Sequence, residues 1–331
     1  MKATQEKETL SKIQFAKDVA KGLASHPKYL LSKYFYDERG DKLFQQIMNL
    51  EEYYLTDCEE EILNKYKGEL SDIFQDSGKP FQLIELGAGD AVKTQILLRH
   101  LNKEYNNFTY IPIDISQHVL TVLEYNLSEN FPELDVRPLH GEYFQALENL
   151  NSPDSKRKII LFLGSTIGNF TYNEALSFLK KLNVRMKKNE QIFIGFDLKK
   201  DPRVILNAYN DSYGITAEFN LNLLRRINNE LGGNFKLGNF YHYPIYDPIS
   251  GEAKSYLVSK QNQTIHIKHL NQTFSFEKGE PIHMEISKKY DIQEIDKLAR
   301  DSGFKLKNSF MDRKKYFADV VIEKSKESNF A

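Results

Sequence analysis

The stretch FQLIELGAGDAVKT, residues 81–94, decides the fold of this chain. A short apolar run over residues 81–86 reaches a glycine turn, GAGD, and a helix-forming segment follows. A short apolar run bounded by glycine favours a buried strand. Glycine has no Cβ, so the backbone can turn sharply there and approach a ligand closely. The stretch therefore predicts a strand, a tight loop and a helix, the building unit of α/β sheets.

The same alternation extends from this stretch to residue 198. We expect two helices before it, at 43–50 and 59–74. Further strands are expected at 108–116, at 135–141, from 158 onward and at 191–198, and further helices at 93–101, 118–127 and 173–186. Thr171 and Glu174 have the spacing of a capping box that opens the last of these helices. Strands alternating with helices predict a doubly wound, mostly parallel sheet.

The alternation stops near residue 199. Residues 199–285 suggest helices followed by strand-like pieces, and the tail then resumes with a helix at 292–304 and a closing hairpin of two antiparallel strands. We expect an α/β domain formed by residues 1–198 and 286–331, with an inserted α+β substrate domain at 199–285. A helix followed by an antiparallel hairpin is how class I methyltransferases end their sheet, an analogy at the level of fold.

Net charge, apolar runs and cysteine content limit the classes of function that the sequence allows. The 331 residues carry a net charge of −1, which gives no electrostatic reason to expect nucleic acid or an anionic membrane as a partner. The N-terminal residues lack the apolar region of a secretory signal, and no apolar run has the length of a membrane span. Cys58, the one cysteine, can form neither an internal disulfide nor a zinc site by itself, so we expect no metal and a cytoplasmic location.

Two cofactors compete for the glycine loop. A dinucleotide such as NAD favours G-x-G-x-x-G, but Val92 occupies the third glycine position. Glu85 and Asp90 lie in or beside the loop, and carboxylates repel a pyrophosphate while they attract the sulfonium and amine of S-adenosylmethionine. Asp114 ends the next strand, where its carboxylate can accept hydrogen bonds from both ribose hydroxyls. The pattern favours S-adenosylmethionine over NAD, with a structural turn as the remaining alternative.

HGEYF, residues 140–144, follows the third expected strand. Glu142 could accept from the adenine amino group and Tyr143 could pack on the adenine ring. An exposed turn explains the same residues equally well from spacing alone.

Five segments in order resemble the histidine Nα-methyltransferases of ergothioneine biosynthesis. They are YFYDERGDKLFQQIMNLEEYYLT (34–56), IELGAGDAVKT (84–94), FLGSTIGNFT (162–171), AYNDSYGITAEFN (208–220) and MEISKKY (284–290). The resemblance extends over roughly residues 28–322. It implies a class I fold, S-adenosylmethionine as cofactor, and transfer of methyl groups to the α-amine of an amino acid. The implied substrate is L-histidine, converted to its trimethyl betaine in three steps.

The resemblance also implies a set of site residues. The cofactor site comprises Gly87, Gly89, Lys93, Asp114, Glu142 and Tyr143. The substrate site comprises Tyr36, Tyr53, Gly164, Thr166, Asn169, Tyr209, Ser255, Glu285 and Ser287. Among these, Tyr36, Thr166 and Asn169 are the candidate catalytic residues. Glu142 departs from the family's usual Asp by one methylene.

Each implied role has a chemical reason. Asn169 and Tyr209 can donate to a substrate carboxylate, and Glu285 and Ser287 can bind the two imidazole nitrogens of histidine. The faces of Tyr36 and Tyr53 can hold a methylated ammonium, and Gly164 and Thr166 would line the space where the amine meets the sulfonium. Taken without the family, a tyrosine more often only packs, Asn169 could be a turn residue and Glu285 an exposed carboxylate.

Ser255 occupies a position where the histidine enzymes of the family carry a methionine. A smaller, polar wall keeps a nearer alternative open, methylation of another amine such as tryptophan or an aromatic derivative. An NAD-dependent oxidoreductase and a non-catalytic S-adenosylmethionine-binding protein are the more distant alternatives. We expect a monomer whose only partner is a small amino acid.

Overall fold

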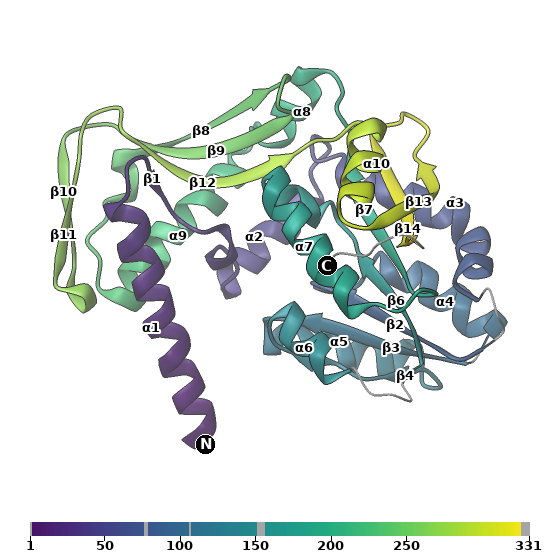
Figure 1. The fold of residues 1–331 in the computed structure, drawn as a ribbon. Helices are drawn as coiled ribbons and strands as arrows, with labels where there is room; N and C mark the ends of the chain where they lie inside the picture. Colours follow the sequence, from purple (N-terminus) through teal and green to yellow (C-terminus); the bar gives the residue numbers. More distant parts are fainter. Residues whose placement is uncertain (1, 76–78, 106, 151–155, 326–331) are drawn as a thin grey trace. The chain divides into compact units, whose positions relative to one another are not determined.

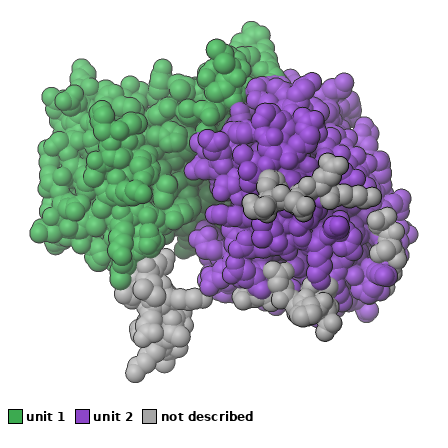
Figure 2. Space-filling view, viewed as in Figure 1, with its two compact units in different colours: residues 1–54, 200–287 green, residues 55–199, 288–331 purple. Residues whose placement is uncertain are grey.

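The computed structural model describes residues 2–75, 79–105, 107–150 and 156–325. They form two compact units, coloured separately in Figure 2. Unit 1 comprises residues 1–54 and 200–287, and unit 2 comprises residues 55–199 and 288–331. Each unit has its own hydrophobic core.

Unit 2 is built on an eight-stranded sheet with the order β13-β14-β7-β6-β2-β3-β4, in which β5 also pairs with β3. The strands are β2 (Phe81–Leu86), β3 (Phe108–Asp114), β4 (Asp135–Val136), β5 (Leu139–His140), β6 (Arg157–Phe162), β7 (Gln191–Asp197), β13 (Phe304–Met311) and β14 (Phe317–Lys324). All pairs are parallel except those that β14 makes with β7 and β13. The strand order reverses at β2, so the loop after β2 lies at the switch point where ligands of such sheets bind.

Helices cover both faces of this sheet (Figure 1). They are α3 (Leu55–Gln75), α4 (Thr94–Tyr105), α5 (Gln117–Asn130), α6 (Tyr143–Asn149), α7 (Tyr172–Arg185) and α10 (Ile292–Asp301). Apolar residues of α6, α7 and α10 pack with Ile192 and Ile194 of β7. Phe193, which points to the other face, contacts Phe74 of α3 with ring centroids 5.8 Å apart. Alternate residues of one strand thus bury against different helices, as expected for a doubly wound sheet.

The expected elements of unit 2 are present, with one difference. The expected strand 135–141 is split into β4 and β5 around Pro138, which has no N–H to donate to a ladder. Arg137 N still donates to Tyr110 O at 2.9 Å, so the chain keeps its course along β3. The capping box of Thr171 and Glu174 at the start of α7 is confirmed.

Unit 1 contains a four-stranded sheet with the order β1-β12-β9-β8 and a two-stranded sheet of β10 and β11. Its strands are β1 (Lys28–Tyr29), β8 (Phe240–Asp247), β9 (Glu252–Ser259), β10 (Gln263–Ile267), β11 (Gln272–Phe276) and β12 (Pro281–Lys288), and its helices are α1 (Lys2–Ala24), α2 (Glu38–Met48), α8 (Pro202–Ala208) and α9 (Ile215–Leu231). β12 ends at Lys288, so its last residue belongs to unit 2. Leu223, Leu224 and Ile227 of α9 are fully buried in the core of this unit.

The structure places residues 1–54 differently from the sequence-based division, which assigned them to the methyltransferase domain. Phe15, Val19 and Leu23 of α1, and Leu43 and Ile47 of α2, are buried in one cluster with α9. The N-terminal segment therefore completes the core of the inserted α+β segment. The expected boundaries at 199 and 285 differ by one and two residues from those of the structure.

Candidate functional site

The glycine loop after β2 has a conformation and a neighbour that both require glycine. Gly87 has φ of +73°, and a Cβ added there would lie 2.7 Å from the Tyr143 hydroxyl. Gly89 has φ of +54° and an added Cβ would meet nothing within 4 Å, so this side of the loop is open. L side chains rarely adopt such φ values. The loop thus presents bare backbone next to an aromatic hydroxyl, as a bulky cofactor needs.

Asp114 ties the loop to the end of β3. Its Oδ2 accepts from Gly89 N at 3.2 Å and its Oδ1 from Ser116 N at 2.9 Å. A carboxylate oxygen has two acceptor directions, so each oxygen can accept one further hydrogen bond. The half-buried Asp114 carboxylate is therefore fixed in place and still able to accept from a diol.

Glu142 and Tyr143 lie next to Asp114. Gly141 N donates to Asp114 O at 3.0 Å, which brings the start of α6 to the end of β3. Burial raises the pKa of Tyr143, and the nearby charges of Asp114 and Glu142 raise it further. The Tyr143 ring meets Phe162 edge-on at 6.1 Å, while Glu142 is exposed and its side chain does not cap α6. The structure thus brings together Gly87, Asp114, Glu142 and Tyr143, and their roles at the cofactor stay predictions.

Glu85 has a different place from the one that the charge argument gave it. It is 4% exposed, beneath the loop, and accepts from the hydroxyls of Thr94, at 2.7 Å, and Tyr110. Burial raises its pKa to about 7, against the lowering effect of these two hydrogen bonds. Glu85 therefore anchors β2 to β3 and α4 from below, and Asp90 remains as the exposed acid of the loop.

Lys93 pairs with a residue that the sequence did not single out. Its ammonium bonds the carboxylate of Glu59 on α3, whose side chain is fully buried while that of Lys93 is 21% exposed. Burial alone would lower the pKa of Lys93, but the charge of Glu59 overrides it and the pKa is raised. Lys93 is thus held as a cation that still reaches solvent, suited to an anionic group of a ligand.

The segment after β6 turns over Lys93. Gly164 has φ of +71°, and a Cβ there would lie 3.7 Å from Lys93 Nζ and 3.8 Å from Thr166 Oγ1. Gly164 N donates to Glu59 Oε1 at 2.7 Å, and the Thr166 hydroxyl donates to Leu163 O at 2.7 Å. Asn169 ends the short 3-10 helix Thr166–Asn169 and is exposed. Gly164 and Thr166 therefore adjoin Lys93, with Asn169 one helical turn further on.

The predicted imidazole-binding residues lie in unit 1. The Tyr209 hydroxyl donates to Ser287 Oγ at 2.7 Å, and both residues are buried. Asn220 of α9, which is not among the predicted site residues, donates from Nδ2 to Glu285 Oε1 at 3.4 Å and to Thr216 O at 3.0 Å. The expected donation from Tyr209 to the substrate carboxylate stays a prediction.

Tyr36 and Tyr53 belong to an aromatic cluster with Phe44 and Phe219. The Tyr36 ring is 5.6 Å from Phe44 and 5.7 Å from Phe219, and Phe44 is 6.4 Å from Tyr53, all in edge-on geometry. Tyr36 is 39% exposed, so part of its ring remains available to a ligand. Phe44 and Phe219 were not predicted as site residues. They lie within two of the segments that carry the family resemblance, 34–56 and 208–220, and this position is the sequence signal that could have identified them.

Ser255 lies in the middle of β9, opposite Pro244 of β8, and is 1% exposed. Among the described residues its Oγ has no hydrogen-bond partner. Leaving a buried hydroxyl without a partner costs about 1–3 kcal/mol. A ligand's polar group would recover part of that cost.

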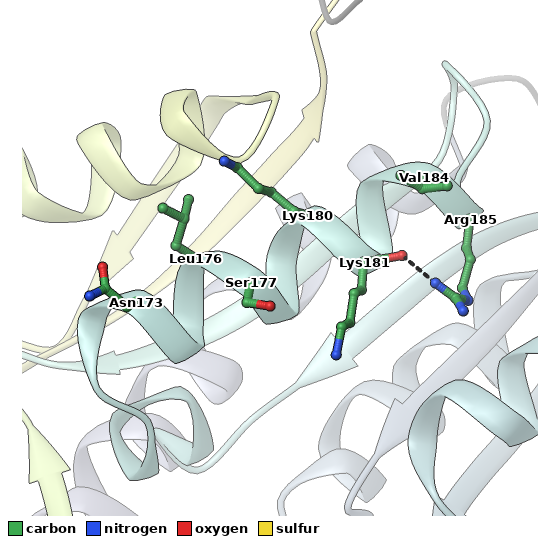
Figure 3. Close-up of a pocket in the computed structure, with 7 residues that line it drawn as sticks. All are labelled: Asn173, Leu176, Ser177, Lys180, Lys181, Val184 and Arg185. Atoms are coloured by element: carbon green, nitrogen blue, oxygen red, sulfur yellow. Dashed lines mark hydrogen bonds between the residues drawn. The ribbon is translucent and has the colours of Figure 1, made fainter. Parts of the chain in front are cut away.

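The described residues contain no group of three or more His, Cys, Asp or Glu side chains placed to hold a metal ion. None of the helices in the described part of the chain is long and apolar enough to cross a membrane. A surface hollow along α7, whose lining includes Lys180, Lys181 and Arg185, contains none of the predicted site residues (Figure 3).

The sheet of unit 2 has the arrangement of a class I methyltransferase, with a glycine loop at the switch point after β2 and a closing antiparallel hairpin of β13 and β14. The family described as histidine-specific methyltransferase, SAM-dependent, matches residues 15–324. This chain belongs to that family and is an S-adenosylmethionine-dependent methyltransferase. The family match does not favour the NAD-dependent alternative, and Val92 at the third glycine position of the dinucleotide motif argues against it as well.

Relatives agree with this assignment. The chain is 32% identical to the histidine N-alpha-methyltransferase of Mycobacterium tuberculosis over 279 residues, 84% of this chain and 85% of that protein. It is 31% identical to the enzyme of the same name from Mycolicibacterium smegmatis, over 87% of this chain and 88% of that protein. It is 28% identical to an L-tryptophan methyltransferase of Psilocybe serbica, over 89% of each chain.

Proposed function

We propose that this protein methylates the α-amine of L-histidine, up to the trimethyl betaine. Membership of the histidine-specific family over residues 15–324 carries the proposal. The carboxylate and amide groups around Glu285 support it, since they suit a side chain with two ring nitrogens. The tryptophan alternative is less favoured, because an indole has one N–H donor and no acceptor.

The residues of unit 2 fit the cofactor. Gly89 leaves the loop open to the cofactor, and Gly87 leaves room for the Tyr143 hydroxyl beside it. Asp114 accepts from the ribose hydroxyls, and Tyr143 packs beside the adenine. Glu142 accepts from the adenine amine, and Lys93 binds the carboxylate of the methionine part. When bound, S-adenosylmethionine supplies an electrophilic methyl group on a positively charged sulfur.

The residues of unit 1 fit the amino acid. Glu285 accepts from the protonated ring nitrogen, and the Ser287 hydroxyl, oriented by Tyr209, serves the other ring nitrogen. The faces of Tyr36 and Tyr53 stabilise the ammonium as it gains methyl groups. The family resemblance further assigns the substrate carboxylate to Asn169 and the path of the amine to Gly164 and Thr166.

The amine must be neutral to attack, so it loses its proton on or before binding. Holding the two reactants aligned then provides most of the rate, with no covalent intermediate on the protein. We expect the rate to rise with pH towards the pKa of the amine, and a profile that is flat through neutrality would contradict this step.

The decisive experiment incubates the purified protein with S-adenosylmethionine and an equimolar mixture of amino acids, followed by mass spectrometry. Histidine should gain one, two and three methyl groups in succession. Selective methylation of tryptophan would instead assign the function to the Ser255 alternative. Monomeric state and a cytoplasmic location remain predictions, testable by sedimentation and by cell fractionation.

A further inference from the structure

Two carboxyl groups face each other in the interior of unit 2, close to Lys93. Glu59 on α3 and Asp319 on β14 are both 0% exposed. Gly195 of β7 pairs with Asp319 across the sheet, and a Cβ on Gly195 would lie 2.5 Å from Glu59 Oε1 and 3.0 Å from Asp319 Oδ1. The missing side chain of Gly195 thus makes the space into which both carboxyls project.

The two partners are not equivalent. Glu59 accepts from Gly164 N at 2.7 Å and pairs with the Lys93 ammonium, so its carboxylate is satisfied as an anion. Among the described residues, no N–H or O–H group donates a hydrogen bond to either carboxyl oxygen of Asp319. The hydrogen-bonding neighbour of Asp319 is Glu59, itself an acceptor. Two carboxyl oxygens form a hydrogen bond only if one of them carries a proton.

Charge places that proton on Asp319. Burial raises the pKa of Asp319 well above its usual range, and the negative charge of Glu59 raises it further, against the opposing effect of Lys93. The other titratable groups near Lys93 are Glu85 and, through Glu85, Tyr110. A second full negative charge against Glu59 would cost far more than it gains from one lysine.

We propose that Asp319 is a protonated acid that donates to Glu59, and that this pair, carrying a single negative charge, positions the Lys93 ammonium and the Gly164 amide at the cofactor crevice. Asp319 and Glu59 are positioning residues that act through Lys93 and Gly164. The inference rests on the proposed role of Lys93 in binding the cofactor's carboxylate.

The pair also explains why the crevice can attract an anionic group although three carboxyls surround one lysine. With Asp319 neutral and Glu59 paired, Lys93 keeps one hydrogen bond to Glu59 and has two further donors. An ionised Asp319 would add a further negative charge beside Lys93, in addition to those of Glu59 and of Glu85 as Glu85 titrates near pH 7, and would weaken the attraction of Lys93 for a carboxylate.

The test measures binding of S-adenosylhomocysteine to variants by calorimetry, without turnover. In Glu59→Gln one amide NH₂ must face either Lys93 or Gly164 N, both donors, so affinity should fall by roughly 10- to 100-fold. Asp319→Ala removes the donor to Glu59 and should weaken binding about 10-fold. Asp319→Asn retains a donor in the same place and should restore most of that loss.

Asn183→Ala provides the matched control. Asn183 is also buried in unit 2, where its Nδ2 donates to Gly303 O at 2.8 Å, on α7 rather than at the crevice. The Asn183→Ala substitution should lower the thermal stability of the protein and leave its affinity for S-adenosylhomocysteine unchanged. Equal weakening by Asn183→Ala and Asp319→Ala would overturn the positioning role.

Infrared difference spectroscopy tests the proton itself. The spectrum of the wild type minus that of Asp319→Asn should contain the carbonyl stretch of a protonated carboxylic acid at neutral pH, and absence of that band would overturn the proposal even if Glu59→Gln does not fold. Lys93→Met separates the proposed cofactor role of Lys93 from the protonation of Asp319. If Lys93→Met binds S-adenosylhomocysteine normally and the wild-type difference spectrum contains the acid band, the cofactor role of Lys93 fails and the acid pair stands.

Discussion

Substitution of Asp114 tests the cofactor site most directly. Its Oδ1 and Oδ2 each accept one backbone N–H, from Ser116 and Gly89, and each has one acceptor direction left for a ribose hydroxyl. Asp114→Ala removes both charge-assisted contacts to the ribose and frees the glycine loop. At about 1.5–3 kcal/mol for such a hydrogen bond, and with partial compensation by water, we expect a net loss of about 3 kcal/mol. This is roughly a 100-fold weaker affinity for the cofactor.

Asp114→Asn is the graded comparison. Asparagine keeps the shape but has one acceptor oxygen, so its NH₂ must face Gly89 N, Ser116 N or one ribose hydroxyl. A loss of about 10-fold is expected. Calorimetry with S-adenosylhomocysteine measures both variants, and circular dichroism checks that they fold. A folded Asp114→Ala protein that binds within about threefold of the wild type would refute the assignment of the ribose to this carboxylate.

Three further predictions test other parts of the molecule. Glu285→Ala should weaken histidine binding by roughly 10- to 100-fold and leave S-adenosylhomocysteine affinity nearly intact, and calorimetry with each ligand would contradict the assigned roles if both fell equally. Gly87→Ala should abolish most cofactor binding, because the new Cβ would lie 2.7 Å from the Tyr143 hydroxyl, and the double variant Gly87→Ala with Tyr143→Phe should recover part of it if that contact is the cause. Glu85 has its pKa raised from 4.5 to about 7, so the folded state binds more protons than the unfolded state between these values and stability falls as pH rises through them. Glu85→Gln removes this loss of stability, which is about 3 kcal/mol at most. The melting temperature of the variant minus that of the wild type should therefore increase from pH 5 to pH 8. If this difference in melting temperature stays the same over that range, the result would contradict the buried location of Glu85.

The sequence by itself determined the sheet, its cofactor loop and the family. The run at 81–86, the glycines at 87 and 89, and Asp114 at the end of the next strand suffice, because strand–turn–helix geometry is local and parallel strands bring their carboxyl ends to one edge. The strand before Glu142 and Tyr143 pairs with β3, so the same logic brings these two residues to the end of β3, while their contact with the adenine stays a prediction.

Only the tertiary structure decided which residues share a core and which carboxyls keep their charge. Residues 1–54 precede the glycine loop in the chain, yet the apolar faces of α1 and α2 bury against α9, more than 150 residues away in sequence. Glu85 looked like an acid of the cofactor loop, but alternation along β2 turns its side chain inward, where burial raises its pKa. Glu59 and Asp319 have no sequence signal at all. Their meeting over Gly195 depends on the packing of α3 on β7 and β14, and the energy of a buried charge depends on such long-range neighbours rather than on local spacing.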